Sequence, residues 1–397
     1  MKVERIKKGN KSKISSLKTL YKALGISASF VNEVLGLPAH EWYTKKEVKK
    51  KDGSKRIVYA PDKKLKHIQN RIKARILADE NIIVWPHYIY GSLKNTVDGD
   101  GNKVIRDYVA CAANHTKSKS LLTVDIEDFF DNVNEYVVEK VIREYFSCSE
   151  DVIAFLLKMC CFEGRLVQGA PTSSYLASMS LYDVEPKIKK KLNRKKLTYT
   201  RFVDDITVSS KVYNYNFTYA LRIIENALTE IGLFLNKDKI LIRYAGAAPL
   251  TVHGLRVDFH NVRLPAEEIK GIRANVRMIE NMATKYKIRT SHAYKKEYER
   301  CMGRVNKLKR TGHNKHGYYL ERLRKVRPIP SRSDIEYSQN KLERLIQLYP
   351  EHKSSYYYNK KYYWLTERLY ILRRSFSKSA NKMLDELKKY QPEKHPK

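Results

Sequence analysis

The stretch YTRFVDDITVSS, which runs from Tyr199 to Ser210, places two adjacent acids, Asp204 and Asp205, between two β-rich segments. The flanking segments YTRFV and ITVSS favour strands, because β-branched and aromatic residues suit a pleated surface. A pair of residues between two such segments predicts a short β-hairpin with the acids at its apex. A carboxylate without a partner is costly to bury, so the pair is either a polar turn, in which aspartate is common, or a site that needs two charges.

A third acid, Asp125, ends the apolar part of the segment LLTVDIEDFF, residues 121–130, which predicts a buried strand. One interpretation is that Asp125 caps the segment that follows it. The other is that the three acids gather on one sheet face, where each raises the pKa of the others unless a cation compensates. Mg²⁺ suits such a cluster because it prefers hard oxygen ligands and leaves positions for substrate phosphates. Two such ions would serve an in-line phosphoryl transfer.

The remaining sequence alternates between expected helices and hairpins. Ser15 or Ser16 suits the N-cap of a first helix that Gly25 ends. A hairpin that turns at Asp52-Gly53 is expected over residues 41–61, and a helix over residues 63–80. Further helices are expected over residues 135–146, 151–162 and 217–233, and a turn followed by one long helix over residues 165–192. Hairpins are expected over residues 197–210 and 251–265. The chain beyond residue 265 is expected to be mostly helical, with breaks near residues 311–316 and 328–330. This order predicts an α+β fold with helices on one face of an antiparallel sheet.

Charge is the strongest global signal in the composition. The chain carries 78 Lys and Arg against 43 Asp and Glu, a net charge of +35, which exceeds what solubility needs and predicts a polyanionic partner such as nucleic acid. Residues 266–397 alone hold 33 Lys and Arg against 14 Asp and Glu. Within them, YYYNKKYYWL of residues 356–365 interleaves aromatic rings with lysines, as on a surface that stacks bases and neutralises phosphates. The alternative is a helical domain whose aromatic residues form its core.

Several classes of protein are disfavoured. The sequence has no apolar run long enough to cross a bilayer, and its basic start lacks the apolar core of a signal peptide, so we expect a cytoplasmic protein that does not bind a membrane. The five cysteines show no CxxC spacing, which argues against a zinc site and against a disulfide framework.

Six segments together resemble the motifs of reverse transcriptases, and in particular those of the bacterial retron type. TRFVDDITVS is similar to their Y/F-x-D-D motif, LLTVDIEDFFDNV to their first catalytic motif, and VQGAPTSSYLA to the Q-G-x-P-T-S segment between the two. GSKRIVYAPDKKLKHIQNRI resembles their fingers segment, CAANHTKS their N-A-x-x-H signature and TVHGLRVD their V-T-G motif. The resemblance covers roughly residues 45–265, in the family's order and spacing.

The resemblance implies a right-hand polymerase fold with fingers, palm and a helical thumb. We expect an N-terminal helix and fingers in residues 1–110, and a palm in residues 111–265 that carries the acids and interleaved fingers segments. Residues 266–397 would form a basic thumb and an RNA-binding C-terminal region.

The resemblance also assigns roles at the catalytic centre. Asp125 and Asp204 would hold both Mg²⁺ ions with the Ile126 carbonyl as a further ligand, and Asp205 would orient or assist them. Phe130 would be the steric gate that excludes a 2′-hydroxyl and so selects deoxynucleotides, unless it packs in the core as the adjacent Phe129 is expected to do.

Further substrate contacts are expected around this centre. Arg56 would bind the triphosphate and Lys239 would lie near the leaving pyrophosphate, since both are cationic. Gln168 and Gly169 would lie along the incoming base and the template strand. We also expect Asp128 to contact the substrate. The residues expected to contact nucleic acid are His253 and Gly254 in the primer grip, Asn114, His115, Tyr357, Lys360 and Lys361.

The predicted function is RNA-directed synthesis of single-stranded DNA on a structured noncoding RNA, primed from a 2′-hydroxyl of that RNA. The resemblance further implies a role in phage defence beside an effector protein, with deoxynucleoside triphosphates as substrates. Ser174 replaces the usual proline of the Q-G-x-P-T-S-P segment and His253 replaces the threonine of V-T-G, which leaves another bacterial defence reverse transcriptase as an alternative. A non-catalytic RNA-binding scaffold is a second alternative, although all three acids are present. An intron-type maturase would have a Cys/His-rich tail, which the sequence lacks.

Overall fold

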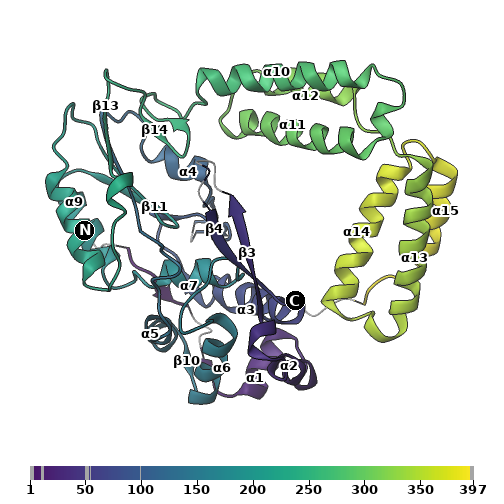
Figure 1. Cartoon of the computed structure of the whole chain (residues 1–397), viewed down its shortest axis with the longest axis horizontal. Helices are drawn as coiled ribbons and strands as arrows, with labels where there is room; N and C mark the ends of the chain where they lie inside the picture. Colours follow the sequence, from purple (N-terminus) through teal and green to yellow (C-terminus); the bar gives the residue numbers. More distant parts are fainter. Residues whose placement is uncertain (1–3, 10–12, 50–52, 54, 99, 394–397) are drawn as a thin grey trace. The chain divides into compact units, whose positions relative to one another are not determined.

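The computed structural model describes residues 4–9, 13–49, 53, 55–98 and 100–393. The chain divides into two compact units, Met1–Arg263 and Leu264–Lys397, which are described separately (Figure 1). No helix in the described part of the chain is long and apolar enough to cross a bilayer. The predicted limits of fingers, palm and thumb stay predictions.

The first unit begins with small elements and two capped helices. Helix α1 (Leu17–Leu24) starts where the Ser16 hydroxyl accepts a hydrogen bond from the Thr19 amide, and it ends at Gly25 with φ of 64°. The predicted first helix is therefore confirmed, with Ser16 as its N-cap. The other elements of this segment are β1 (Lys7–Lys8), β2 (Lys13–Ile14), α2 (Ala28–Leu35) and η1 (Ala39–Glu41).

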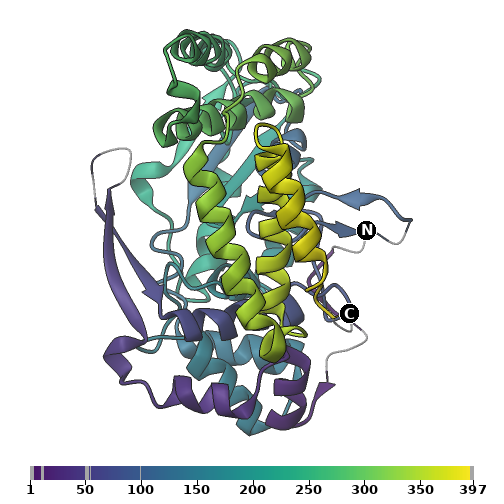
Figure 2. The same ribbon diagram turned by 90° about the vertical axis from the view of Figure 1, so that its right-hand side faces the viewer.

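A long hairpin follows, formed by β3 (Tyr43–Lys49) and β4 (Lys55–Pro61). The two strands pair antiparallel from Tyr43 opposite Pro61 to Lys49 opposite Lys55, as predicted. Asp52 of the predicted turn lies outside the described residues. The hairpin extends from the body of the unit and most of its side chains are exposed (Figure 2). Helix α3 (Lys63–Ile72) and the π-helical turn η2 (Lys73–Leu77) then fill the predicted helix of residues 63–80.

The central sheet has the strand order β13-β9-β12-β11-β6. Antiparallel pairing joins β13 (Leu241–Tyr244), β9 (Ser120–Asp125), β12 (Asp205–Ser210) and β11 (Thr198–Phe202), which confirms the predicted antiparallel sheet and the predicted β11–β12 hairpin. The edge strand β6 (Ile89–Tyr90) adds a pairing that was not predicted, because it runs parallel to β11.

The two faces of this sheet have different partners. Leu122, Val208 and Tyr199 share one face, where they join a buried cluster with residues of α8 (Glu185–Arg194) and α9 (Thr218–Thr229). The alternating residues, including Asp125 and Asp205, lie on the other face. The prediction of helices on one face is incomplete, since α4 (Tyr108–Ala113) packs on the second face, where the Cys111 thiol donates to the Thr200 hydroxyl.

A turn followed by one long helix is expected over residues 165–192, but the single long helix is wrong, because the structure divides it into α7 (Ser173–Met179) and α8 with a turn at residues 181–184 between them. Pro186 lies in the first turn of α8, where its missing N–H is tolerated, whereas inside one continuous helix it would remove a backbone hydrogen bond. The predicted helices α5 (Glu135–Tyr145), α6 (Glu150–Cys160) and α9 are confirmed.

Short elements complete the first unit. The predicted hairpin over residues 251–265 is present as β14 (Thr251–Val252) and β15 (Leu255–Arg256). The remaining elements are β5 (Ile83–Val84), β7 (Thr96–Val97), β8 (Lys103–Val104), β10 (Ser147–Cys148) and η3 (Lys237–Lys239).

The described part of the second unit is helical, as predicted. It contains α10 (Ala266–Ala283), η4 (Ile288–Thr290), α11 (His292–Arg310), α12 (His316–Lys325), α13 (Arg332–His352), α14 (Tyr356–Leu372) and α15 (Ser377–Lys388). The expected breaks separate α11 from α12 and α12 from α13, and a further break follows α10. Leucines and tyrosines of α13, α14 and α15 form a buried cluster of their own.

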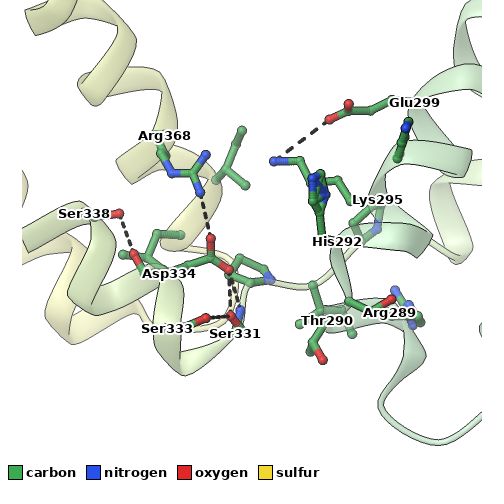
Figure 3. A pocket seen from close by; sticks show the side chains of 17 residues that line it. Arg289, Thr290, His292, Lys295, Glu299, Ser331, Ser333, Asp334, Ser338 and Arg368 are labelled. Carbon is green, nitrogen blue, oxygen red and sulfur yellow. Dashed lines mark hydrogen bonds and ion pairs between the residues drawn. The ribbon is translucent and has the colours of Figure 1, made fainter. Parts of the chain in front are cut away.

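A cavity of about 670 Å³ lies within this second unit, lined by residues of α11, α13, α14 and the segment between α12 and α13 (Figure 3). Arg368 of α14 forms an ion pair of 2.8 Å with Asp334, which also accepts hydrogen bonds from the amide and hydroxyl of Ser331. None of the three predicted catalytic acids lines this cavity.

Candidate active site

Sheet register brings the three acids together. Asp125 is the last residue of β9 and lies directly opposite Asp205, the first residue of β12. Asp204 occupies the two-residue loop between β11 and β12. One carboxylate oxygen of each acid lies within 4.8 Å of the others. The acids thus form one cluster, as the alternation of side chains along two antiparallel strands predicted.

Neighbouring backbone fixes the loop that carries Asp204. The Val203 amide donates to the Tyr90 carbonyl of β6 at 3.2 Å, and the Ile126 amide donates to the Asp204 carbonyl at 3.1 Å. Gly91 follows β6, and a Cβ there would lie 2.8 Å from Cγ2 of Val203. The parallel strand β6 therefore supports the Val203-Asp204 loop, which nothing in the short sequence of β6 indicated.

Crowding makes the acids difficult to ionise together. Desolvation, followed by the charges of Asp204 and Asp125, raises the pKa of Asp205 to about 7. Desolvation raises the pKa of Asp204 as well, and the Asp125 charge adds to this effect. Without a cation the cluster therefore retains a proton near neutral pH. A set of three clustered carboxylates suits a hard divalent ion, which relieves their mutual repulsion.

Two of the predicted phosphate-binding cations act on this cluster. The Lys239 ammonium lies 2.7 Å from Oδ2 of Asp125, and this hydrogen bond raises the pKa of Lys239. The chain holds Lys239 there because the Asn236 amide, just before η3, donates to the Asp125 carbonyl at 2.8 Å. Arg56 is exposed on β4, and its charge lowers the pKa of Asp204 against the larger effect of desolvation. Both cations lie within electrostatic reach of the acids.

Phe130 has an intermediate environment. Its ring is partly buried against the core, and its centroid lies 5.9 Å from that of the buried Phe129. The partial exposure leaves the gate prediction open. Asp128, two residues earlier, is exposed with φ of 39°, and its carbonyl accepts a hydrogen bond from Asn132.

Gln168 and Gly169 contact the β3–β4 hairpin. The Gln168 carbonyl accepts a hydrogen bond of 2.8 Å from the Tyr59 amide of β4. Gly169 has φ of 121°, and a Cβ there would lie only 2.4 Å from the Tyr59 carbonyl oxygen. The close approach that requires this glycine is therefore that of the β4 backbone. The predicted contacts with template and incoming base remain predictions.

The predicted contact of His115 with nucleic acid is wrong. The imidazole is completely buried, with Nδ1 2.7 Å from the Ser209 hydroxyl and Nε2 2.7 Å from the Thr200 hydroxyl. Desolvation lowers the pKa of His115 to about 3, so the ring is neutral and ties β11 to β12. Asn114 is exposed, but its amide donates to the Tyr90 hydroxyl at 2.8 Å, so it also braces the sheet edge.

His253 reaches the acidic cluster from the β14–β15 hairpin. Its ring packs on Phe202 with centroids 4.6 Å apart, and Nδ1 lies 3.9 Å from Oδ2 of Asp205. Desolvation lowers the pKa of His253 to about 4, so this contact is not an ion pair at neutral pH. His253 and the exposed Gly254 form the two-residue loop of this hairpin. The residues of the predicted primer grip thus lie beside the β11–β12 hairpin.

The aromatic segment of α14 divides between core and surface. Tyr358 and Tyr362 are buried, whereas Tyr357 is 50% exposed. The Lys361 ammonium lies 4.1 Å from the centroid of the Tyr357 ring, and Lys360 is exposed. The segment therefore contributes both to the core and to the surface, and its contact with nucleic acid stays a prediction.

Known proteins similar to this chain identify its family. Residues 48–259 match the family described as reverse transcriptase (RNA-dependent DNA polymerase). The Retron Ec48 reverse transcriptase of Escherichia coli is 40% identical over 365 residues, which cover 92% of this chain and 89% of that protein. The Retron Se72 reverse transcriptase of Salmonella heidelberg is 26% identical over 308 residues, 77% of each chain.

Among solved structures, telomerase from Candida albicans in complex with a fragment of telomeric RNA aligns over 99% of this chain and 74% of that one. Its identity of 10% and TM-score of 0.39 are too low to support a structural argument. The family match and the retron relatives are sufficient without it. The chain therefore belongs to the reverse transcriptase family, as a bacterial retron-type RNA-directed DNA polymerase with an α+β right-hand fold.

Proposed function

We propose that this polymerase joins deoxynucleotides at the cluster of Asp125, Asp204 and Asp205 with two Mg²⁺ ions bound there. The observation that carries the proposal is the β9–β12 register, which sets Asp205 opposite Asp125 and leaves Asp204 in the adjoining loop, all within 4.8 Å. The raised pKa of Asp205 supports it, because repulsion among these carboxylates is relieved by a divalent cation.

The residues present fit two hard cations. Asp125 and Asp204 would contact both ions, the Ile126 carbonyl would add a ligand, and Asp205 would orient the other carboxylates. When bound, the ions would supply positive charge that activates the primer hydroxyl and stabilises the leaving pyrophosphate. Lys239, whose ammonium lies 2.7 Å from Asp125, would also donate to a phosphate oxygen of the bound triphosphate.

The substrates of this site would be deoxynucleoside triphosphates. Arg56 on β4 and Lys239 on η3 would hold the triphosphate, since both act on the cluster electrostatically. The partly exposed Phe130 ring would block a 2′-hydroxyl. The path of the incoming base and the template, on the side of the β3–β4 hairpin, would be lined by Gln168, Gly169 and Asp128.

The template would be a structured noncoding RNA, from which the enzyme makes single-stranded DNA after priming at a 2′-hydroxyl. The excess of basic residues in 266–397 supports this proposal, as do the retron relatives. We assign residues 1–110 to fingers, 111–265 to palm and 266–397 to thumb and RNA binding, with Tyr357, Lys360 and Lys361 on the surface that contacts RNA. A cytoplasmic role in phage defence beside an effector protein completes the proposal.

Primer extension on an RNA template tests the catalytic assignment. Asp204→Asn should abolish deoxynucleotide incorporation while RNA binding persists, because it removes one charge without changing side-chain size. Asp238→Asn is the matched control, since Asp238 is exposed in η3 beside Lys239 but outside the cluster. Incorporation by Asp204→Asn at the wild-type rate would refute the proposal, and RNA binding without incorporation by the wild type would favour the scaffold alternative.

A further inference from the structure

A buried arginine lies in the strand that leads into the Val203-Asp204 loop. Arg201 of β11 is completely buried, and its alternation along the strand points it away from the acids, toward α8. Its Nε and Nη2 donate to the two carboxylate oxygens of Glu185 at 2.7 and 2.8 Å. Nη2 also donates to the Ser178 carbonyl at 3.0 Å. Nothing in the sequence around Arg201 indicates a role for it beyond its place in a strand.

Every contact of this network holds the guanidinium in one orientation. Glu185 is 1% exposed, and the Tyr199 hydroxyl donates to its Oε1 at 2.8 Å, so the carboxylate itself is fixed. A bidentate pair of this kind is directional, because the planar guanidinium matches the carboxylate fork. A buried ion pair is weak evidence for stability, since apolar residues of similar volume often replace it without loss. The orientation that it imposes is the more informative property.

The remaining nitrogen, Nη1, donates to the Val203 carbonyl at 2.9 Å. Val203 precedes Asp204 and has φ of 59°, a region that β-branched residues avoid. The backbone angle φ is positive at Val203 but not at Asp204, as at the two central residues of a type II′ turn. Glycine is preferred at the first of these two central positions. The Tyr90 carbonyl accepts from the Val203 amide, so Val203 is held through the peptide group before it and through the peptide group after it. A strained backbone conformation persists only where contacts with the surrounding structure hold it in place.

We propose that Arg201 is a positioning residue for DNA synthesis: oriented by Glu185, its guanidinium holds the Val203 carbonyl and so keeps the Asp204 carboxylate in place within the acidic cluster. The inference rests on the proposed role of Asp204 as a metal ligand. Without the clamp, Val203 relaxes toward negative φ and turns the following peptide. Glycine at position 203 would remove the strain and with it the need for the clamp.

A combined substitution tests the clamp without leaving a buried charge alone. Arg201→Met with Glu185→Leu removes both members of the pair, and Val203→Gly is then made alone and on this background. Relative to wild type, the paired variant should lose about tenfold or more in kcat and in the affinity for Mn²⁺, measured by electron paramagnetic resonance of the free ion. RNA affinity should stay within about twofold, because the second unit is unaltered. Adding Val203→Gly should restore most of both losses.

The control is Arg143→Met with Glu150→Leu, which removes a bidentate pair from the exposed surface of the first unit and should change neither quantity. Circular dichroism establishes folding, and if the paired variant is unfolded the cycle is run with Arg201→Lys, which keeps the charge but loses the fork. Unchanged kcat and Mn²⁺ affinity in the folded variant would overturn the proposal, as would losses that Val203→Gly does not restore. The same measurement separates this proposal from the proposed metal-binding role of Asp204. If Asp204 does not hold the metal, wild type will bind Mn²⁺ no better than Asp204→Asn does.

Discussion

Replacing Asp205 by asparagine should stabilise the metal-free protein above neutral pH, although it should abolish DNA synthesis. The pKa of Asp205 rises from an ordinary value of 3.8 to about 7, first through desolvation and then through the charges of Asp204 and Asp125. The folded chain therefore binds this proton more tightly than the unfolded chain does. The free energy of unfolding consequently falls as the pH rises between these two values.

The gain in unfolding free energy expected for Asp205→Asn follows from the pKa shift of Asp205 and from the exposure of its side chain. A shift from 3.8 to about 7 corresponds to at most about 4 kcal/mol, at about 1.4 kcal/mol per pKa unit. The Asp205 side chain is 53% exposed, and water screens part of the repulsion, so we expect about 1–2 kcal/mol. In a protein of 397 residues that corresponds to a rise in Tm of about 1–3 °C.

Thermal unfolding with a chelator at pH 8 and pH 5 measures this effect. Asp205→Asn should melt above wild type at pH 8 and close to it at pH 5, where the acid is already protonated. Added Mg²⁺ should raise the Tm of wild type at pH 8 more than that of the variant. The exposed Asp238→Asn should match wild type at both pH values. Equal melting of wild type and Asp205→Asn at pH 8 would refute the argument that the cluster is strained by charge.

Three further substitutions test the substrate path. Phe130→Ala should lower the preference for deoxynucleotides over ribonucleotides by about tenfold or more in single-nucleotide incorporation, whereas an unchanged ratio would assign Phe130 to packing. Gly169→Ala should lower the free energy of unfolding by about 2 kcal/mol in denaturant titrations, because its Cβ meets the Tyr59 carbonyl. Gly164→Ala is the control, because Gly164 also has a positive φ but a Cβ there would meet no other atom. An equal loss of unfolding free energy in Gly164→Ala would show that the contact with the Tyr59 carbonyl is not the cause. Lys239→Met should raise KM for the triphosphate about tenfold in steady-state kinetics, and an unchanged KM would remove Lys239 from the substrate site.

The convergence of the acids was predictable because it depends on local rules. Asp125 ends one strand and Asp204-Asp205 joins two others, and strand alternation brings such positions together once the strands pair antiparallel. The caps of α1 and the breaks around α12 follow from equally local signals. The family motifs added the order and spacing that distinguish this cluster from an ordinary polar turn.

Long-range packing accounts for what the sequence did not predict. His115 was expected to contact nucleic acid, but hydroxyls from two strands distant in sequence bury it. The pairing of Arg201 with Glu185 and of β6 with β11 depends on tertiary structure, and two-residue strands have no periodicity to detect. Gly169 is required by the approach of β4, which only the folded chain shows.

A structure with an RNA template, a primer, a non-hydrolysable deoxynucleotide and Mn²⁺ tests the central claim most directly. Anomalous scattering should locate two Mn²⁺ ions that share the carboxylates of Asp125 and Asp204, with the triphosphate against Arg56 and Lys239. Manganese bound elsewhere, or a nucleotide bound away from Asp204, would contradict the assignment of this cluster as the site of DNA synthesis.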